Sequence, residues 1–111
     1  MPADLPLVND ENFDKLVLKS DLPVVVDFFQ PGFPDYCNKL DVLVAVAKDY
    51  DGEVAICRAD TRTARKAVDR FAVDGVPCLV IARKGKILGK PALAVVTKAG
   101  LATMIKDRLK P

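Results

Sequence analysis

The chain has 111 residues, half of them hydrophobic, and a formal net charge of +2 at pH 7. This length and composition suit a single domain over residues 1–111 that buries its own hydrophobic core. No apolar run approaches the roughly 18 residues that a membrane span needs, and so small a net charge does not indicate nucleic-acid binding. The chain has no histidine, which removes the most common metal ligand and general base.

The three cysteines, Cys37, Cys57 and Cys78, have no close partner in the sequence. An odd number without a close pair argues against a disulfide framework and against a zinc site. We therefore expect no metal and no other cofactor. The acidic N-terminus lacks the charged and then apolar order of a secretory signal, so a cytoplasmic location is expected.

The first elements predicted along the chain are a strand, a helix and a second strand. Residues 5–8 suit a short edge strand, and Asn9 or Asp10 can cap a helix that runs to about residue 19. Residues 24–29 form a continuous β-branched and aromatic run, Val-Val-Val-Asp-Phe-Phe. Such a run is typical of a strand that is covered on both faces.

A second helix is expected from about Pro34 to Tyr50, because proline suits the first helical position. The residues expected on its inward face are Leu40, Leu43, Val44 and Ala47. Residues 54–57 predict a buried strand, and a third helix is expected from Thr61 or Arg62 to Phe71.

The last part of the chain predicts a strand at residues 76–82, a tight turn at Lys84-Gly85 and a further strand at residues 86–88. A final helix is expected at residues 97–109. Strands that alternate with helices imply parallel pairing with right-handed crossovers, and the closing hairpin adds antiparallel strands. The fold class is therefore α/β.

This order of elements resembles the thioredoxin family over nearly the whole chain, from about residue 5 to residue 110. The segments that carry the resemblance are Asp-Glu-Asn-Phe at 10–13, Val-Asp-Phe at 26–28, Gly-Val-Pro at 75–77, and Gly85 in the hairpin. The resemblance implies a thioredoxin-like α/β fold, in which helices flank both faces of a central mixed sheet of four or five strands.

The resemblance breaks where the family has Cys-Gly-Pro-Cys, because this chain has Phe33-Pro34-Asp35-Tyr36. Family chemistry needs a stabilised thiolate at a helix N-terminus and a second cysteine that resolves the mixed disulfide. Phe33 and Tyr36 cannot form a disulfide, so no dithiol exchange is expected by that mechanism. Deliberate removal of a dithiol would normally leave two serines, which these residues are not.

Other features of the family's site also differ. Phe29 and Gly32 replace two tryptophans, Asp41 replaces the proline that kinks the helix, and residues 92–94 lack the glycine beside the substrate groove. The scaffold segments are retained while the residues around the reactive turn are not. This contrast favours a change of function over general divergence.

The resemblance also implies a groove for a protein or peptide partner. Pro77 matches the family's cis-proline, and the backbone at Val76 matches the position that pairs with an extended peptide by strand addition. Phe33, Pro34 and Tyr36 would border this groove, which predicts a protein-binding, chaperone or assembly module. Two simpler interpretations stay open, since Pro77 can serve only to fix its loop and the aromatic side chains can fold onto the domain surface.

An alternative function depends on Cys37, which lies one residue past the motif in the first turn of the expected helix. A lowered pKa there would suit a monothiol oxidoreductase or a redox sensor. Against this, Asp35 raises the pKa of a nearby thiol, and no resolving cysteine is close in sequence. Cys57 and Cys78 are expected to be small buried hydrophobic residues, separated by the strand at residues 24–29.

Asp27 matches the buried carboxylate that assists proton transfer to the family's dithiol, but here it has no thiol to serve. Arg58, which matches a family lysine, is expected to pair with it through a planar two-point contact, as a structural ion pair. The third helix has a basic face, interrupted by aspartates, formed by Arg58, Arg62, Arg65, Lys66 and Arg70. We interpret this face as solvated and expect neither a nucleic-acid nor a membrane partner.

Overall fold

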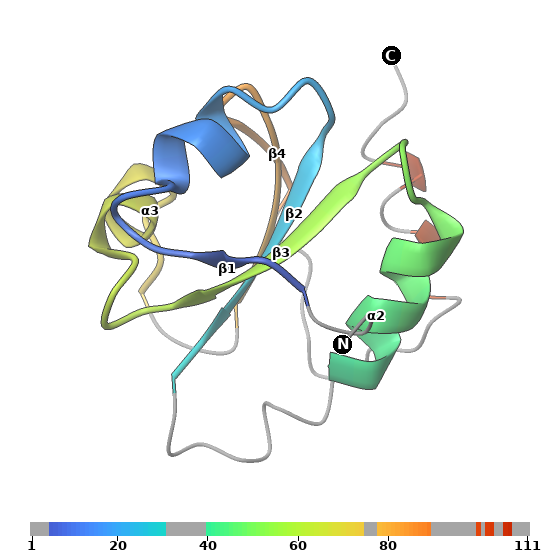
Figure 1. Ribbon diagram of the computed structural model, residues 1–111, viewed down its shortest axis with the longest axis horizontal. Coiled ribbons are helices and arrows are strands. Elements are labelled where there is room, and N and C mark those ends of the chain that lie inside the picture. Colours follow the sequence, from blue (N-terminus) through green and yellow to red (C-terminus); the bar gives the residue numbers. More distant parts are fainter. Residues whose placement is uncertain are drawn as a thin grey trace.

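The computed structural model describes residues 5–30, 40–74 and 78–89, together with residues 100, 102, 103, 106 and 107. Its centre is a five-stranded mixed sheet in the order β1-β3-β2-β4-β5 (Figure 1). The strands are β1 (Leu7–Val8), β2 (Val24–Phe29), β3 (Ala55–Asp60), β4 (Cys78–Arg83) and β5 (Lys86–Gly89). The expected α/β architecture with four or five strands is confirmed.

Helical segments cover both faces of this sheet. The short η1 (Asp14–Leu18) and α3 (Arg65–Arg70) lie on one face, and α2 (Leu40–Asp49) lies on the other (Figure 1). Residues 100, 102, 103, 106 and 107 also have helical backbone, within the segment where the last helix was expected.

Strand β2 is the centre of the sheet. It pairs in parallel with β3, from Val24 opposite Ala55 to Phe29 opposite Asp60, and antiparallel with β4. Its side chains alternate between the faces, so it contributes to both hydrophobic clusters. The continuous apolar run predicted this double burial correctly.

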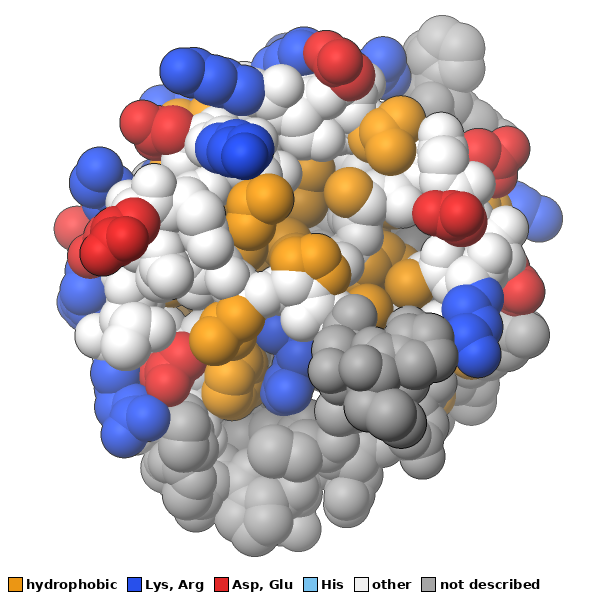
Figure 2. Space-filling view, in the orientation of Figure 1, with side chains coloured by type: hydrophobic (Ala, Val, Ile, Leu, Met, Phe, Trp, Pro, Cys, Tyr) orange, Lys and Arg blue, Asp and Glu red, His pale blue; other side chains and the backbone are white. Residues whose placement is uncertain are grey.

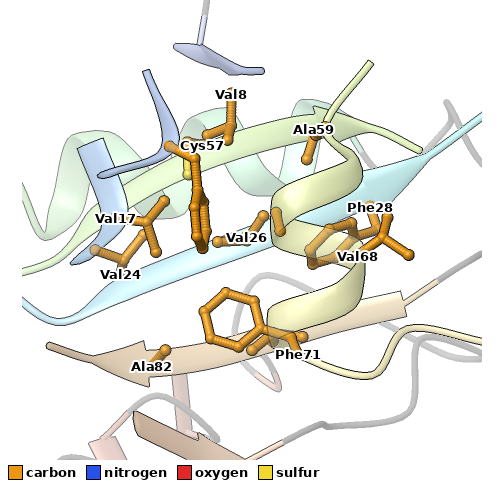
Figure 3. Packing of buried hydrophobic residues seen from close by; sticks show 14 residues of the cluster. Val8, Val17, Val24, Val26, Phe28, Cys57, Ala59, Val68, Phe71 and Ala82 are labelled. Carbon is orange, nitrogen blue, oxygen red and sulfur yellow. The ribbon is translucent and has the colours of Figure 1, made fainter. Parts of the chain in front are cut away.

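The larger cluster lies between the sheet and the helical segments η1 and α3 (Figure 3). Phe13 and Phe71 meet there edge to face, with ring centroids 5.9 Å apart and planes at 77°. This is a favourable geometry for an aromatic pair. The fully buried members include Val8, Val24, Val26, Phe28, Ala59, Ala67 and Val80.

The smaller cluster lies under α2. Among the α2 side chains that the structure describes, Leu43 and Val46 are buried, whereas Val44, which was expected to face inward, is half-buried. They pack with Val25, Val54, Ile56, Leu79 and Ile81.

Lys84 and Gly85 form the tight turn between β4 and β5. Their φ angles are +52° and +83°, which is the left-handed conformation that a two-residue hairpin turn needs. A Cβ at Gly85 would lie 2.7 Å from Arg70 Nη2 and 2.8 Å from a Leu18 methyl group. Glycine is therefore required both by the backbone conformation and by the packing against η1 and α3.

Several elements differ from the sequence prediction in type or in bounds. In η1 the Lys19 N–H donates to the Asp14 carbonyl oxygen, five residues earlier, so the turn is a π-helix and not an ordinary α-helical turn. Strand β3 continues to Asp60 because its backbone pairs with β1 and β2, although Arg58 is charged. Helix α3 begins only at Arg65, because the Asp60 carbonyl oxygen accepts hydrogen bonds from the Thr63 and Ala64 N–H groups and closes a turn there.

Helix α3 is capped by a residue far away in the sequence. Its own N-cap residue, Ala64, has no side chain that can accept a hydrogen bond. Instead Asp10 Oδ1 accepts a hydrogen bond of 2.8 Å from the Lys66 N–H, and the Asp10 N–H donates to the Thr63 carbonyl oxygen. Asp10 thus joins the β1–η1 connection to the start of α3.

We predict that Asp10→Ala lowers the free energy of unfolding by about 1 kcal/mol, the usual effect of losing a helix cap. The measurement is chemical denaturation at pH 7. Glu11→Ala, one residue away and exposed, is the matched control and should change stability by less than about 0.5 kcal/mol. Equal effects of the two substitutions would contradict the capping role of Asp10.

Candidate functional site

The candidate groove residues Phe33, Pro34, Tyr36, Val76 and Pro77 lie outside the described residues, as does Cys37. The described residues next to these segments belong to strands β2 and β4 of the sheet. Phe28 of β2 and Cys78 of β4 are direct antiparallel partners. The end of β2 and the start of β4 therefore lie at the same end of the sheet.

Near this end of the sheet an ion pair joins β2 and β3. Asp27 and Arg58 are parallel partners, and Arg58 Nε donates a hydrogen bond of 3.0 Å to Asp27 Oδ2. The two side chains are 5% and 15% exposed, so the pair is largely removed from water. The Arg58 Cζ atom lies 4.0 Å from the ring centroid of Phe29, which is a cation–π contact.

Arg58 and Asp27 form an ion pair, as expected, but with a single hydrogen bond and not the two-point contact that a guanidinium can make. Only Nε donates to the carboxylate, and Nη2 is buried with no hydrogen-bond acceptor in the part of the chain that the structure describes. Because the guanidinium is rigid and its Cζ atom is held against the Phe29 ring, the orientation that suits Nε does not bring Nη2 into hydrogen-bonding geometry with Asp27. The pair is therefore only partly satisfied.

Burial raises the pKa of the Asp27 carboxyl group above its usual value, and the hydrogen bond and positive charge of Arg58 offset only part of this effect. A raised pKa means that folding opposes ionisation of Asp27. Between the usual pKa and the raised one, the folded chain binds more protons than the unfolded chain. The contribution of Asp27 to stability therefore falls as pH rises through this interval.

The Cys57 thiol lies on the opposite face of the sheet from Arg58. Its burial, assisted by the negative charge of Asp27, raises the pKa of Cys57 to about 12. Its sulfur donates a hydrogen bond of 3.7 Å to the Val25 carbonyl oxygen. Cys57 is thus a buried, protonated side chain with no nucleophilic character at neutral pH.

Cys57 and Cys78 do not form a disulfide, as the sequence predicted, because β2 lies between their strands. Cys78 differs from expectation in one respect. It is half-buried at the margin of the larger cluster, not enclosed within it. Cys78 is the first residue of β4, and its position at the end of the strand accounts for this exposure.

Asp60 is a site residue that the sequence interpretation missed, since it appeared only as a break in the basic face. It lies at the end of β3, opposite Phe29, and is buried. Arg62 holds it through its backbone N–H at 2.9 Å and through Nε and Nη2 at 3.2 and 3.0 Å. These hydrogen bonds lower the pKa of Asp60, although the Arg62 side chain is 61% exposed. An aspartate at the end of a strand, two residues before an arginine, is a signal for such a turn.

The basic face predicted for the third helix included Arg58 and Arg62, but Arg58 lies in β3 and Arg62 precedes α3. The arginines outside β3 are partly engaged in local contacts. Arg65 donates to the Thr61 carbonyl oxygen and Arg70 to the Gly85 carbonyl oxygen, while Arg62 pairs with Asp60. Within the described ranges, no group of three or more His, Cys, Asp or Glu side chains could hold a metal ion. No helix in those same ranges is long and apolar enough to cross a membrane.

Comparison with known proteins gives one family over almost the whole chain. A family model described as Thioredoxin matches residues 4–107. The chloroplastic M-type thioredoxin of Brassica napus is 33% identical over 107 residues, which are 96% of this chain and 59% of that protein. The thioredoxins of Haemophilus influenzae and Synechocystis are 24% and 27% identical, over 92% and 94% of this chain and 94% and 96% of their own lengths. This chain thus spans less than two thirds of the Brassica protein.

The raised pKa of Asp27 predicts a pH-dependent effect of Asp27→Asn. Asparagine keeps an oxygen that can accept from Arg58 Nε and removes the buried negative charge. Relative to wild type, the variant should gain stability as pH rises from about 4, with a slope of at most about 1.4 kcal/mol per pH unit. The measurement is the free energy of unfolding from pH 4 to 8, with the exposed Asp51→Asn as control. A relative loss of stability toward high pH would contradict the assignment.

The burial of Cys57 predicts that its thiol is protected from alkylation in the folded protein. At pH 8 we expect iodoacetamide to modify Cys57 about 10³-fold or more slowly than in denaturant, because labelling requires global unfolding. Peptide mapping by mass spectrometry measures the rate at each cysteine separately. Rapid modification of Cys57 in the native state would show that the thiol is not enclosed by β2 and β3.

Proposed function

Because the chain belongs to the thioredoxin family, we propose that it is a thioredoxin-like protein that lacks the redox dithiol and binds a protein or peptide partner, as a chaperone or an assembly module. The observation that carries this proposal is the sequence Phe33-Pro34-Asp35-Tyr36 in place of Cys-x-x-Cys. With cysteines only at positions 37, 57 and 78, no two thiols have the spacing that the family mechanism uses. The binding surface is the groove formed by Phe33, Pro34, Tyr36, Val76 and Pro77.

Two properties of the described residues support a binding role. The pairing of β2 with β4 and the two hydrophobic clusters provide a rigid base next to the groove segments. Cys57 is protonated and enclosed, and β2 separates it from Cys78, so this pair offers no substitute dithiol. Rigid placement favours binding because less conformational entropy is lost when the partner docks.

The second candidate is a divergent thiol–disulfide oxidoreductase or redox sensor that acts through Cys37. It is supported by the position of Cys37, one residue after the motif, and by the similarity to proteins named thioredoxins. A single thiolate can attack a disulfide, but an external thiol must then resolve the mixed disulfide. The relatives include chloroplastic and bacterial proteins, so the cytoplasmic location stays a prediction.

An insulin-disulfide reduction assay separates the two candidates. We expect no activity above a control that contains dithiothreitol alone, because the chain lacks the Cys-x-x-Cys dithiol of the family mechanism. Activity that disappears in Cys37→Ala would overturn the binding-module proposal and favour the monothiol enzyme. Activity that persists in Cys37→Ala would refute both assignments.

Pull-down with immobilised protein tests the groove itself. The double variant Phe33→Ala, Tyr36→Ala should lose most of the captured partner, since aromatic side chains commonly dominate interface energies. Ile87→Ala, which shortens an exposed hydrophobic side chain on β5, is the control. A partner captured equally by wild type and the double variant would place the binding surface elsewhere.

A further inference from the structure

The turn between β4 and β5 concentrates positive charge. Three of the four residues at positions 83–86 are basic, and Arg70 of α3 is held against the turn by a hydrogen bond of 3.3 Å from its Nε to the Gly85 carbonyl oxygen. Among the described residues, Asp21 pairs with Lys84 at 3.2 Å, but both side chains are exposed, so this pair is weak. Figure 2 shows Lys and Arg side chains along the upper rim of the molecule, where Figure 1 places η1 and the upper end of β4.

Arg83 and Lys86 lie directly opposite each other in this hairpin. They are Cα partners in the pairing of β4 with β5, so their side chains project from the same face of the sheet, with Cβ atoms about 5 Å apart. Ile81, two residues before Arg83, packs into the smaller cluster, so this face is the one on which α2 lies. Both basic side chains are exposed, and within the described ranges neither forms an ion pair.

The repulsion between these two side chains has no evident structural benefit. Like charges in directly opposite positions destabilise a hairpin. Protection of an edge strand from unwanted pairing explains one lysine, and Lys86 on the edge strand β5 supplies it. Arg83 lies on the inner strand β4, where its charge adds repulsion without shielding the edge. A negative group on a partner would turn this repulsion into attraction, which favours a binding role for the pair.

An acidic peptide segment fits this surface better than a nucleic acid does. The formal net charge of the chain is only +2, and none of the aromatic side chains that the structure describes is exposed. Those residues therefore offer no aromatic surface on which bases could stack. The exposed Ile87 is the partner of Ala82 and projects from the opposite face, so charge dominates at the pair. A guanidinium beside an ammonium group suits a carboxylate, which an arginine can bind through two parallel hydrogen bonds.

We propose that Arg83 and Lys86 form a docking site for an acidic segment of a partner protein, with a carboxylate of the segment between the guanidinium and the ammonium group. The neighbouring cations of the turn add to the positive potential that attracts the segment. This site goes beyond the proposed groove and does not depend on it. Phe29 and Cys78, which adjoin the groove segments in the chain, lie at the other ends of β2 and β4.

The test begins with selection from a random decapeptide display library on immobilised wild-type protein. We expect a class of selected peptides rich in Asp and Glu. When a synthetic peptide of this class is added to isotope-labelled protein, the amide chemical shifts should change at residues 83–86. Replacing its acidic residues with Asn and Gln should weaken binding about fivefold or more, and added salt should also weaken it.

Matched charge-removing variants test the pair directly. Arg83→Gln with Lys86→Gln should bind the acidic peptide about fivefold or more weakly. Lys15→Gln with Lys66→Gln removes the same charge from exposed positions on η1 and α3 and should bind it like wild type. Equal losses in the two double variants would show that only net charge matters and would overturn the site. Thermal unfolding establishes that both variants are folded, and the first should be at least as stable as wild type because it loses a repulsion.

Charge reversal gives an independent readout. Arg83→Glu with Lys86→Glu keeps a like-charge pair and should reject the acidic peptide, but it should bind the peptide in which lysines replace the acidic residues. Failure to select acidic peptides, chemical-shift changes confined to residues outside the hairpin, or binding that the reversal leaves unchanged would each overturn the proposal.

Two further comparisons separate this site from its alternatives. If a single-stranded oligonucleotide or vesicles that contain phosphatidylserine bind more tightly than the peptide, and lose binding in the Arg83→Gln, Lys86→Gln variant, the assignment to an acidic protein segment is wrong. The Phe33→Ala, Tyr36→Ala variant should bind the acidic peptide as wild type does. Loss of binding in that variant would place the acidic peptide in the groove and overturn the hairpin site.

Discussion

The double burial of β2 is the constraint on which the rest of the structure depends. Its backbone bonds to β3 on one side and β4 on the other, and helical segments cover both of its faces. Val26 and Phe28 enter the larger cluster and Val25 enters the smaller one. Each such side chain contributes about 1.5–3 kcal/mol when fully buried. A slip of one residue would exchange the two faces, so the packing fixes the register of β2 against both neighbours.

This register determines the electrostatics of the site. It places the Asp27 carboxylate inside the domain and sets Arg58 directly beside it on β3. Burial of the carboxylate raises the pKa of Asp27, and the hydrogen bond and positive charge of Arg58 offset only part of this effect. The same carboxylate adds to the burial that keeps the Cys57 thiol protonated. One charge in the central strand thus influences the chemistry on both faces of the sheet.

Sequence patterns predicted the features that depend on local composition. The apolar run identified β2, and the Lys84-Gly85 pair identified the hairpin. The end of β3 was missed because its charged residues interrupt the apolar pattern while the backbone continues to pair. The cap on α3 was missed because Asp10 and Lys66 are 56 residues apart and meet only in the folded chain. The partner of Asp27 could be named from sequence, but the orientation of the guanidinium depends on Phe29.

Arginine at position 58 explains why this ion pair stays incomplete. An ammonium group can rotate its three donors toward whichever acceptors are present, whereas a guanidinium holds its five donors in fixed directions. Once Nε bonds to Asp27 and Cζ lies against the Phe29 ring, the rigid guanidinium also determines the direction of Nη2.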